Sequence, residues 1–228
     1  MKIDIYASGS GGNCYRLSDG ETTVLLECGI PCRQIMQNIR FEIRSIAGVL
    51  LTHDHMDHAK AAKDLAGFGI DIYSSEGTFK ALGLSGYHFK TVRALQSFDI
   101  GTLNVFPFDV QHDVPEPLGY VITSRKTGER LLFFTDTYYL KYVFNGVDII
   151  MGEVNYSLDT INKDISKSRR DRLYESHMSL EHFMEFLRAS DLSRLKRVYL
   201  LHLSDDNSDE VYFKTEIQKL TGAEVTVC

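Results

Sequence analysis

Residues 48–58 read GVLLTHDHMDH, and this stretch decides the fold prediction. A short apolar run that ends at a turn is typical of a buried strand. Three of the chain's eight histidines follow that run within six residues, and a solvated turn has no need of three imidazoles. Imidazole and carboxylate groups are suitable ligands for zinc, manganese or iron. The stretch therefore predicts part of a metal site, made of His53, His55, Asp57 and His58.

A metal site needs further ligands, and isolated candidates follow three other apolar runs. His112 comes after residues 103–110, Asp136 after residues 131–135, and His202 after residues 198–201. Each residue alone would be an ordinary surface or satisfied polar group. Because side chains at strand ends can converge on one point, the three together with the first cluster are predicted to be ligands.

Short apolar runs alternate with amphipathic stretches along the chain, which favours an α/β protein with helices sheltering the strands. Strands are expected near residues 3–6, 14–18, 22–27, 48–52, 71–74, 103–110, 120–124, 130–134, 148–151, 198–201 and 224–227. Helices are expected near residues 32–39, 57–68, 76–82, 180–190 and 208–220. Ser179 is expected to cap the fourth helix, and Asn207 or Ser208 the fifth. No Pro-rich linker or repeat interrupts the pattern, so one domain over residues 1–228 is expected.

Composition narrows the possible functions. The chain has 25 Lys and Arg against 31 Asp and Glu, a net charge of -6, so it lacks the basic excess that drives strong non-specific binding to nucleic acid. No stretch of about 18 or more uncharged apolar residues occurs, and the first residues do not resemble a signal peptide. Four cysteines are too few for a disulfide scaffold. These features favour a cytoplasmic protein that does not enter a membrane.

The segment at about 157–176 is highly charged and breaks the alternation. Its basic residues are offset by Asp159, Asp164, Asp171 and Glu175, and they are Lys163, Lys167, Arg169, Arg170 and Arg172. Two interpretations stay open: an inserted helical flap over the site, or an ordinary solvated surface helix.

Two other features also allow two interpretations. The glycine-rich stretch GSGGN at 9–13 could bring backbone amides close to an anionic substrate, or it could form plain tight turns. Tyr138 and Tyr156 are candidates for stacking a nucleobase, against the core packing expected for most tyrosines.

The order of the candidate ligands, His-x-His-x-Asp-His followed by an isolated His, an Asp and a final His, resembles the five-motif signature of the metallo-β-lactamase superfamily over nearly the whole chain. Four shorter stretches resemble its WalJ-like (YycJ-like) branch, whose characterised members are nucleic-acid 5′ exonucleases: GSGGNC at 9–14, VQHD at 110–113, EPLGY at 116–120 and TDT at 135–137. The resemblance implies an αββα four-layer sandwich with a dinuclear metal site.

The resemblance also implies two divalent metal ions, most simply zinc or manganese, with iron possible. The implied assignment puts one ion on His53, His55 and His112 and the second on Asp57, His58 and His202, with Asp136 bridging. Glu27 stands where the family usually has an aspartate that braces the ligand loop from behind, which leaves the geometry of that brace open.

Two residues receive catalytic roles. Asp57 can orient the water that the two metals share. The resemblance places His177, just before the fourth expected helix, facing the substrate, where it would bind phosphate or protonate the leaving group. The alternative for His177 is that it helps to cap that helix.

The sequence therefore predicts a metal-dependent hydrolase. Its most direct form is a phosphodiesterase or 5′ exonuclease that acts on nucleic acid through a metal-bridging hydroxide. Two alternatives stay open: a hydrolase of small esters, thioesters or lactones, and a non-catalytic metal-binding module. Nucleic acid or another phosphodiester is the expected partner, and the sequence gives no oligomeric state.

Overall fold

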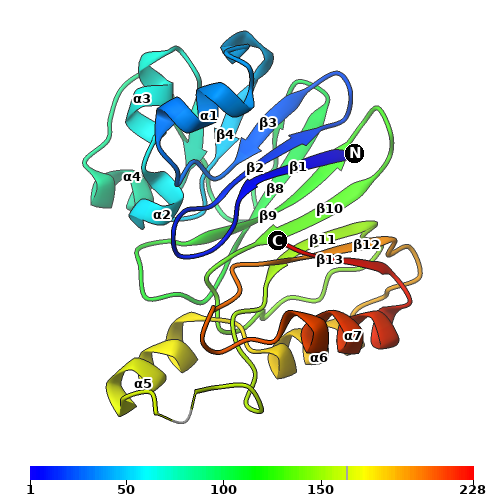
Figure 1. Cartoon of the computed structure of the whole chain (residues 1–228). Helices are drawn as coiled ribbons and strands as arrows, with labels where there is room; N and C mark the ends of the chain where they lie inside the picture. The colour runs from blue at the N-terminus through cyan, green and yellow to red at the C-terminus, as the bar shows by residue number, and fades with distance from the viewer. Residues whose placement is uncertain (163) are drawn as a thin grey trace. The chain divides into compact units, whose positions relative to one another are not determined.

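The computed structural model describes residues 1–162 and 164–228 and divides into two compact units (Figure 1). The first unit comprises Met1–Asp109 and Val114–Glu129, and the second comprises Val110–Asp113 and Arg130–Cys228. The organisation of residues 1–228 as one domain stays a prediction.

The first unit is built on a six-stranded sheet whose strands lie in chain order. Strands β1 to β3 pair antiparallel, and β3 to β6 pair parallel. These strands are β1 (Lys2–Ala7), β2 (Cys14–Ser18), β3 (Thr23–Leu26), β4 (Gly48–Leu50), β5 (Ile72–Ser74) and β6 (Phe89–Thr91). The unit also contains an antiparallel group formed by β7 (Phe98–Ile100), β8 (Leu103–Asp109) and β9 (Leu118–Ser124). Strands β6 and β7 were not expected, because their sequences, FKT and FDI, each have a charged residue at the centre and form no apolar run.

Helices pack on one face of the six-stranded sheet (Figure 1). They are α1 (Cys32–Asn38), the short 3-10 helix η1 (Ile43–Ser45), α2 (Met56–Ala59), α3 (Ala62–Gly67) and α4 (Glu76–Leu82). Their buried side chains meet alternate strand residues in one core, which includes Ile35, Leu65 and Phe79 from helices and Leu25, Val49 and Leu51 from the sheet. Burying this surface fixes the register of the strands, because a slip by one residue would turn each apolar side chain away from the helices.

The single helix expected over residues 57–68 is in fact two helices, α2 and α3, and a distant contact explains the break. The carbonyl of Asp57 accepts a hydrogen bond from the backbone N–H of Asn13 at 2.7 Å. The N–H of Ala61 instead donates to the carbonyl of Cys28, at 2.9 Å. Because this replaces the usual bond from residue 61 to residue 57, the first helix ends after one turn.

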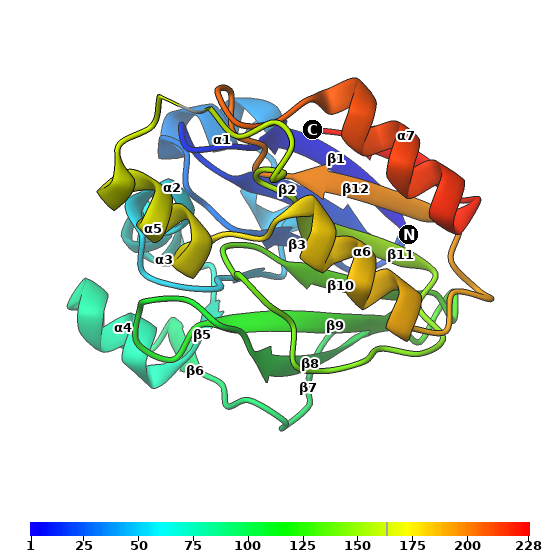
Figure 2. The same cartoon turned by 90° about the horizontal axis from the view of Figure 1, so that it is seen from below.

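The second unit contains four parallel strands in the order β10 (Arg130–Phe134), β11 (Ile149–Glu153), β12 (Arg197–Leu201) and β13 (Glu224–Val227). Two long amphipathic helices, α6 (Leu180–Ala189) and α7 (Glu210–Thr221), run along these strands (Figure 2). Phe134 packs against Phe183 and Phe186 of α6, with ring centroids 6.0 and 6.1 Å apart. Such close aromatic packing ties α6 to the sheet.

Side-chain caps begin both of these helices. Ser179 accepts a hydrogen bond from the N–H of His182 and caps α6, as expected. The expected cap of α7 at Asn207 or Ser208 is wrong: Asp209 accepts from the N–H of Tyr212. Asp, Asn and Ser are about equally good caps, so the sequence alone did not choose among them.

The charged segment contains a helix over only part of its length, α5 (Lys167–Ser176). Lys163 lies outside the described residues. No helix in the described part of the chain is both long enough and apolar enough to cross a membrane.

Candidate metal centre

In the first unit, residues 53–58 form a ligand loop that leads from β4 into α2. The His53 ring is buried, and its Nδ1 lies 2.8 Å from the Thr52 hydroxyl. Its centroid lies 4.8 Å from the ring of His55 and 4.2 Å from the ring of His58. Three imidazoles therefore crowd one turn of chain directly after a buried strand.

His58, in the first turn of α2, lies between the carboxylate of Asp57 and the buried carboxylate of Glu27. His58 is fully buried; its Nε2 lies 3.5 Å from Asp57 Oδ2 and its Nδ1 lies 3.6 Å from Glu27 Oε1. The other oxygen of Glu27 accepts a hydrogen bond from the N–H of Thr52 at 3.3 Å. Glu27 thus contacts both ends of the ligand loop, so the longer carboxylate can brace the loop from behind.

The glycine-rich stretch packs against the same loop. The Asn13 side chain donates to the carbonyl of Asp57 at 3.3 Å and lies 3.2 Å from His58 Nε2. A Cβ at Gly29 would lie 1.6 Å from the Asp57 carbonyl oxygen, and one at Gly12 would lie 2.7 Å from the carbonyl oxygen of Gly29. These close approaches need glycine. The stretch therefore holds the ligand loop in place. Contact between the amides of this stretch and an anionic substrate stays a prediction.

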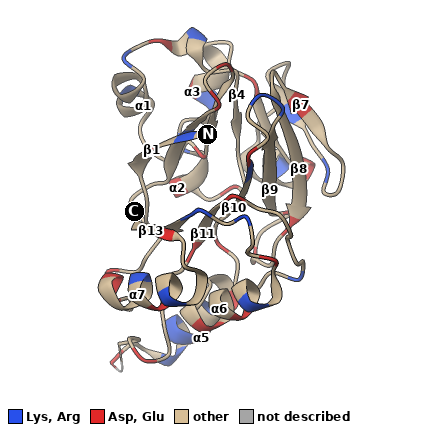
Figure 3. Cartoon of the chain, turned by 90° about the vertical axis from the view of Figure 1, so that its right-hand side faces the viewer, with Lys and Arg blue, Asp and Glu red and all other residues tan. Residues whose placement is uncertain are grey.

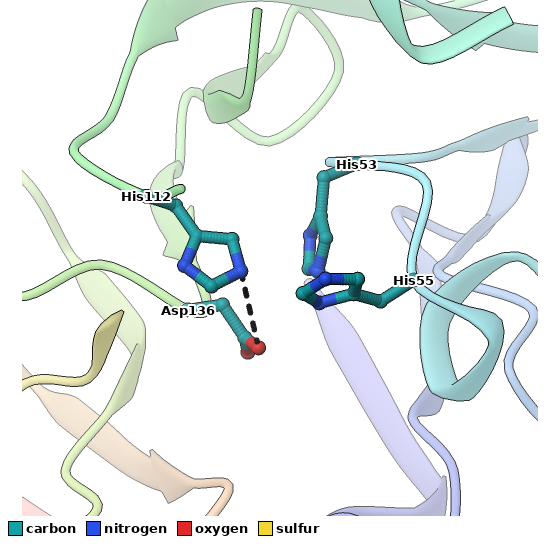
Figure 4. A group of neighbouring side chains, drawn as sticks. All are labelled: His53, His55, His112 and Asp136. Atoms are coloured by element: carbon teal, nitrogen blue, oxygen red, sulfur yellow. Dashed lines mark ion pairs between the residues drawn. The ribbon is translucent and has the colours of Figure 1, made fainter. Parts of the chain in front are cut away.

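The second unit carries its own set of ligand types. The side chain of His112 is buried; its Nδ1 lies 3.3 Å from Asp113 Oδ1 and its Nε2 lies 3.9 Å from Asp136 Oδ2. Figure 4 marks the ion pair between His112 and Asp136 with a dashed line and also labels His53 and His55 of the ligand loop. Asp136 follows β10 by two residues and is buried.

Thr137, the second threonine of the TDT motif, ties the segment around His112 to the end of β10. Its hydroxyl accepts a hydrogen bond from the N–H of Gln111 at 2.9 Å, and its own N–H donates to Glu153 Oε2 at 3.0 Å. The N–H of Tyr138 donates back to the carbonyl of Gln111 at 3.2 Å. The motif therefore positions two ligand-bearing segments through backbone bonds.

Glu153, at the end of β11, organises two histidines. It is fully buried; its Oε1 accepts a hydrogen bond from His177 Nδ1 at 2.5 Å and lies 3.5 Å from His202 Nδ1. The rings of His177 and His202 stack with centroids 5.4 Å apart. The side chain of Asn155 donates to the carbonyl of His202 at 2.8 Å. His177 does not cap α6, since Ser179 does so, and the capping alternative is wrong.

The electrostatic setting differs between the two buried glutamates. Burial raises the pKa of Glu27, although His58 and Thr52 oppose the shift. Burial acts in the same direction on Glu153, but His177 and His202 outweigh it and hold the pKa of Glu153 below its ordinary value. Burial in turn lowers the pKa of His177, but the charge of Glu153 outweighs that effect and the net shift is upward. Glu153 and His177 therefore behave as a charged, hydrogen-bonded pair.

Three residues at the ends of strands adopt left-handed backbone conformations. Glu27 follows β3 with φ 61°, Asp136 follows β10 with φ 42°, and His202 follows β12 with φ 53°. Such a conformation costs a residue other than glycine about 1 to 3 kcal/mol. The backbone is therefore strained at these three strand ends, and the fold must compensate for that cost.

The structure groups the predicted residues within each unit. The ligand loop holds His53, His55, Asp57 and His58, and the second unit brings together His112, Asp136, His177 and His202. Glu153 and Asn155 were not predicted from the sequence, and Asn13 was predicted only as part of the GSGGNC motif. Glu153 carries the same signal as the recognised residues, a polar side chain at the end of an apolar strand, whereas Asn155 carries none.

The donor chemistry fits divalent metal ions. In the second unit, Asp136, Glu153, His177 and His202 each offer one ligand atom, and these atoms lie within 4.8 Å of one another. Buried imidazoles and carboxylates at such spacing are the ligands of zinc, manganese and iron sites. Buried carboxylates also contact the rings, Glu27 at His58 and Glu153 at His177 and His202, and such contacts usually orient metal-binding histidines.

The fold and these side chains together define a metallohydrolase. The chain belongs to the β-lactamase superfamily, because the family model described as "Beta-lactamase superfamily domain" matches residues 22–203. The metallo-β-lactamase fold protein YhfI from Bacillus subtilis superimposes with a TM-score of 0.76 at 15% identity, over 99% of this chain and 95% of that one. This match confirms the predicted fold class.

Two curated relatives match over most of their length. The exodeoxyribonuclease WalJ of Streptococcus pneumoniae is 27% identical over 246 residues, which cover 100% of this chain and 91% of that protein. The exodeoxyribonuclease YycJ of Bacillus anthracis is 26% identical over 225 residues, which cover 91% and 84%. The predicted resemblance to this branch is confirmed, and family and relatives support a hydrolytic enzyme.

Proposed function

We propose that this protein is a metal-dependent phosphodiesterase, and specifically a 5′ exonuclease that acts on nucleic acid. The observation that carries the proposal is the full set of imidazole and carboxylate ligands at strand ends, each group backed by a buried glutamate. Relatives named exodeoxyribonucleases support the choice of a nucleic-acid substrate.

In this proposal the two sets of side chains serve one dinuclear centre. His53, His55 and His112 would hold one ion and Asp57, His58 and His202 the other, and Asp136 would complete the set of ligands. Zinc and manganese suit this mixed nitrogen and oxygen set best, and iron is compatible with it.

Two divalent ions would supply Lewis acidity and lower the pKa of water at the site. The chain's own side chains then orient the water and transfer protons. The Asp57 carboxylate, 27% exposed, can accept a hydrogen bond from the attacking water. His177 has its Nδ1 proton held by Glu153, so its Nε2 is the atom that can give a proton to the leaving oxygen.

A cytoplasmic location belongs to the same proposal. All four cysteines are free thiols, which suits a reducing compartment. The supply of nucleic-acid ends and of divalent ions there would match the proposed reaction.

The test is a substrate panel with the purified protein loaded with manganese or zinc. The substrates are bis(p-nitrophenyl) phosphate, end-labelled DNA with a 5′ phosphate, a thioester and a lactone. We expect metal-dependent release of nucleotides from the DNA and a metal content of two ions for each chain by elemental analysis. Cleavage of the thioester or lactone alone would indicate the small-ester hydrolase. No cleavage of any substrate with both ions bound would indicate the non-catalytic metal-binding module.

A matched pair of histidine variants tests whether the loss of a proposed ligand has a larger effect than the loss of a histidine elsewhere. His112→Ala removes a proposed ligand, so we expect metal content and DNA cleavage to fall together. His88→Ala removes a half-buried histidine that pairs with Asp71 instead, with Nδ1 and Oδ1 2.8 Å apart. Equal losses in the two variants would contradict the ligand assignment.

A further inference from the structure

Helix α5 differs from the other long helices of the second unit because it lacks an apolar face. It buries only Ser176, whereas α6 buries Leu180, Phe183, Phe186 and Leu187. A helix that is polar all round is held by charge pairs or by a partner, since little core packing holds it. Charge pairs are therefore the first explanation to check.

Among the residues that the structure describes, none of the cations of α5 forms an ion pair with an acidic side chain. Four basic residues against two acidic ones give the helix a net charge of +2, in a chain whose net charge is -6. Exposed lysines of α4 and α7 pair with acids one turn away, Lys80 with Glu76 at 2.6 Å and Lys219 with Glu216 at 2.8 Å. Within residues 1–162 and 164–228, no ion pair joins Lys167 to Asp171, although the two are four residues apart. Figure 3 colours these cations blue on α5.

An aromatic residue lies on the same helix. Tyr174 is 37% exposed, and its ring is tilted by 38° against that of Tyr156, with the centroids 5.5 Å apart. Tyr156 is only 3% exposed, which agrees with the core-packing interpretation and not with base stacking. Lys167, Arg170 and Tyr174 are spaced three and four residues apart, which places them along one side of the helix.

The end of α5 leads into the proposed site. Ser176 donates a hydrogen bond to Asp113, the neighbour of His112, at 3.4 Å, and His177 is the next residue. Ten helical residues span about 15 Å, which is the length of about four stacked nucleotides at 3.4 Å for each phosphate. A strand lying along α5 would therefore deliver its end to His177.

We propose that α5 is a binding track for single-stranded nucleic acid, with its cations on the phosphates and Tyr174 under a base. This inference rests on the proposed nuclease function and adds the form of the substrate. Exposed rings stack on bases that are not already stacked in a duplex, so the track suits a single strand. Phosphate contacts would account for cations that have no acidic partner.

The test measures binding without cleavage, with metal-free protein and a fluorescent oligothymidylate in EDTA. Replacing Lys167 and Arg170 by Gln should reduce the slope of log affinity against log salt by about 1.4, because each single-strand phosphate contact contributes about 0.7. At about 0.1 M salt this corresponds to an affinity about 25-fold lower. An unchanged slope would overturn the proposal.

The matched control removes the same charge elsewhere. Arg33 and Lys63 are exposed on the first unit, and replacing them by Gln should leave the slope close to that of the unmodified chain. Thermal unfolding of both double variants checks that they fold. An equal effect of the two double variants would indicate general charge attraction and would overturn the track.

The aromatic contact has its own pair of variants. Tyr174→Ala should weaken binding about 5- to 150-fold, since stacking on one base contributes about 1 to 3 kcal/mol, while Tyr174→Phe should retain it. Tighter binding of duplex than of single strand would overturn the proposal. Binding through α5 with no DNA cleavage under any metal would refute the nuclease function but support the binding track. DNA cleavage with an unchanged salt slope would refute the binding track but support the nuclease function.

Discussion

Two buried carboxylates on either side of β3 are in opposite situations. Asp19, in the turn between β2 and β3, accepts four hydrogen bonds, from the N–H groups of Glu21 and Thr22 and the hydroxyls of Thr102 and Ser124. Glu27, directly after β3, accepts one backbone hydrogen bond and faces a histidine, on a left-handed backbone. Burial opposes the charge of both residues, but the bonds of Asp19 outweigh it and lower the pKa of Asp19 to about 2, while the pKa of Glu27 is raised.

Strand β11 repeats the contrast in the second unit. Asp148, just before the strand, accepts hydrogen bonds from the N–H of Arg130 at 3.0 Å and from Arg194 at 2.8 Å, and it pairs with Lys196 at 3.1 Å. Glu153, at the other end, faces two histidines. In both units a carboxylate with several polar partners precedes a strand, and a glutamate that faces histidine lies at the carboxyl end of that strand. Stability and proposed chemistry are therefore placed on either side of the same strands.

The largest effect that would sharpen this contrast is expected at His177. His177→Ala should lower turnover on DNA about 10²- to 10⁴-fold, the usual contribution of a general acid. Turnover of bis(p-nitrophenyl) phosphate should fall much less, because p-nitrophenolate leaves without a proton. Steady-state kinetics on both substrates make the comparison.

The control for that variant is His182→Ala. His182 lies on α6, and its Nδ1 lies 3.1 Å from the carbonyl of Tyr138. Turnover on DNA should change little in this variant. An equal fall on both substrates in His177→Ala would exclude proton donation and leave a positioning role.

A smaller effect is expected at the carboxyl end of β3. Glu27→Gln should weaken metal binding about 10- to 100-fold, because the carboxylate that orients and polarises His58 is lost. Competition with a chromogenic chelator measures the affinity. Glu27→Asp, which restores the residue usual in the family, should be less affected, and Glu42→Gln on the exposed surface should have no effect. An unchanged metal affinity in Glu27→Gln would show that Glu27 does not brace the ligand loop.

A change at Asp19, in the turn before β3, should affect the free energy of unfolding and not metal binding. The pKa of Asp19 is about 2 in the folded chain against an ordinary value of 3.8, which corresponds to about 2 kcal/mol of stability. Because the folded pKa is the lower one, this contribution is complete above about pH 4 and is lost as the pH falls towards 2. Asp19→Asn should therefore lower the free energy of unfolding by about 2 kcal/mol at pH 7, measured by urea unfolding.

The same urea series between pH 7 and pH 3 supplies the check. The unmodified chain should lose stability more steeply on acidification than Asp19→Asn. Asp99→Asn, which changes an exposed carboxylate paired with Arg125, serves as the control. Parallel pH profiles for the unmodified chain and Asp19→Asn would show that Asp19 does not stabilise the hairpin.

Much of this arrangement was predictable because its signals are local. Buried strands followed by His or Asp located β4, β10 and β12 together with their side chains. Glu153 was missed for a physical reason: the expected strand stopped at Met151, so the carboxylate fell outside the strand-end position that identified the other residues.

What could not be predicted depends on contacts between distant parts of the sequence. The break between α2 and α3 follows from the bond between Asn13 and Asp57, 44 residues apart. The pairing of Thr137 with Gln111 spans 26 residues. Neither bond leaves a mark in local periodicity, and the single-sequence pattern therefore gave one continuous helix.

Gly29 sets a limit on how this chain can be redesigned. Because no side chain fits between its Cα and the carbonyl of Asp57, even alanine there would push the aspartate out of place. Libraries that seek a different metal preference should keep position 29 fixed and vary the residues behind the histidines. Any homologue with a larger residue at this position would need a differently routed loop.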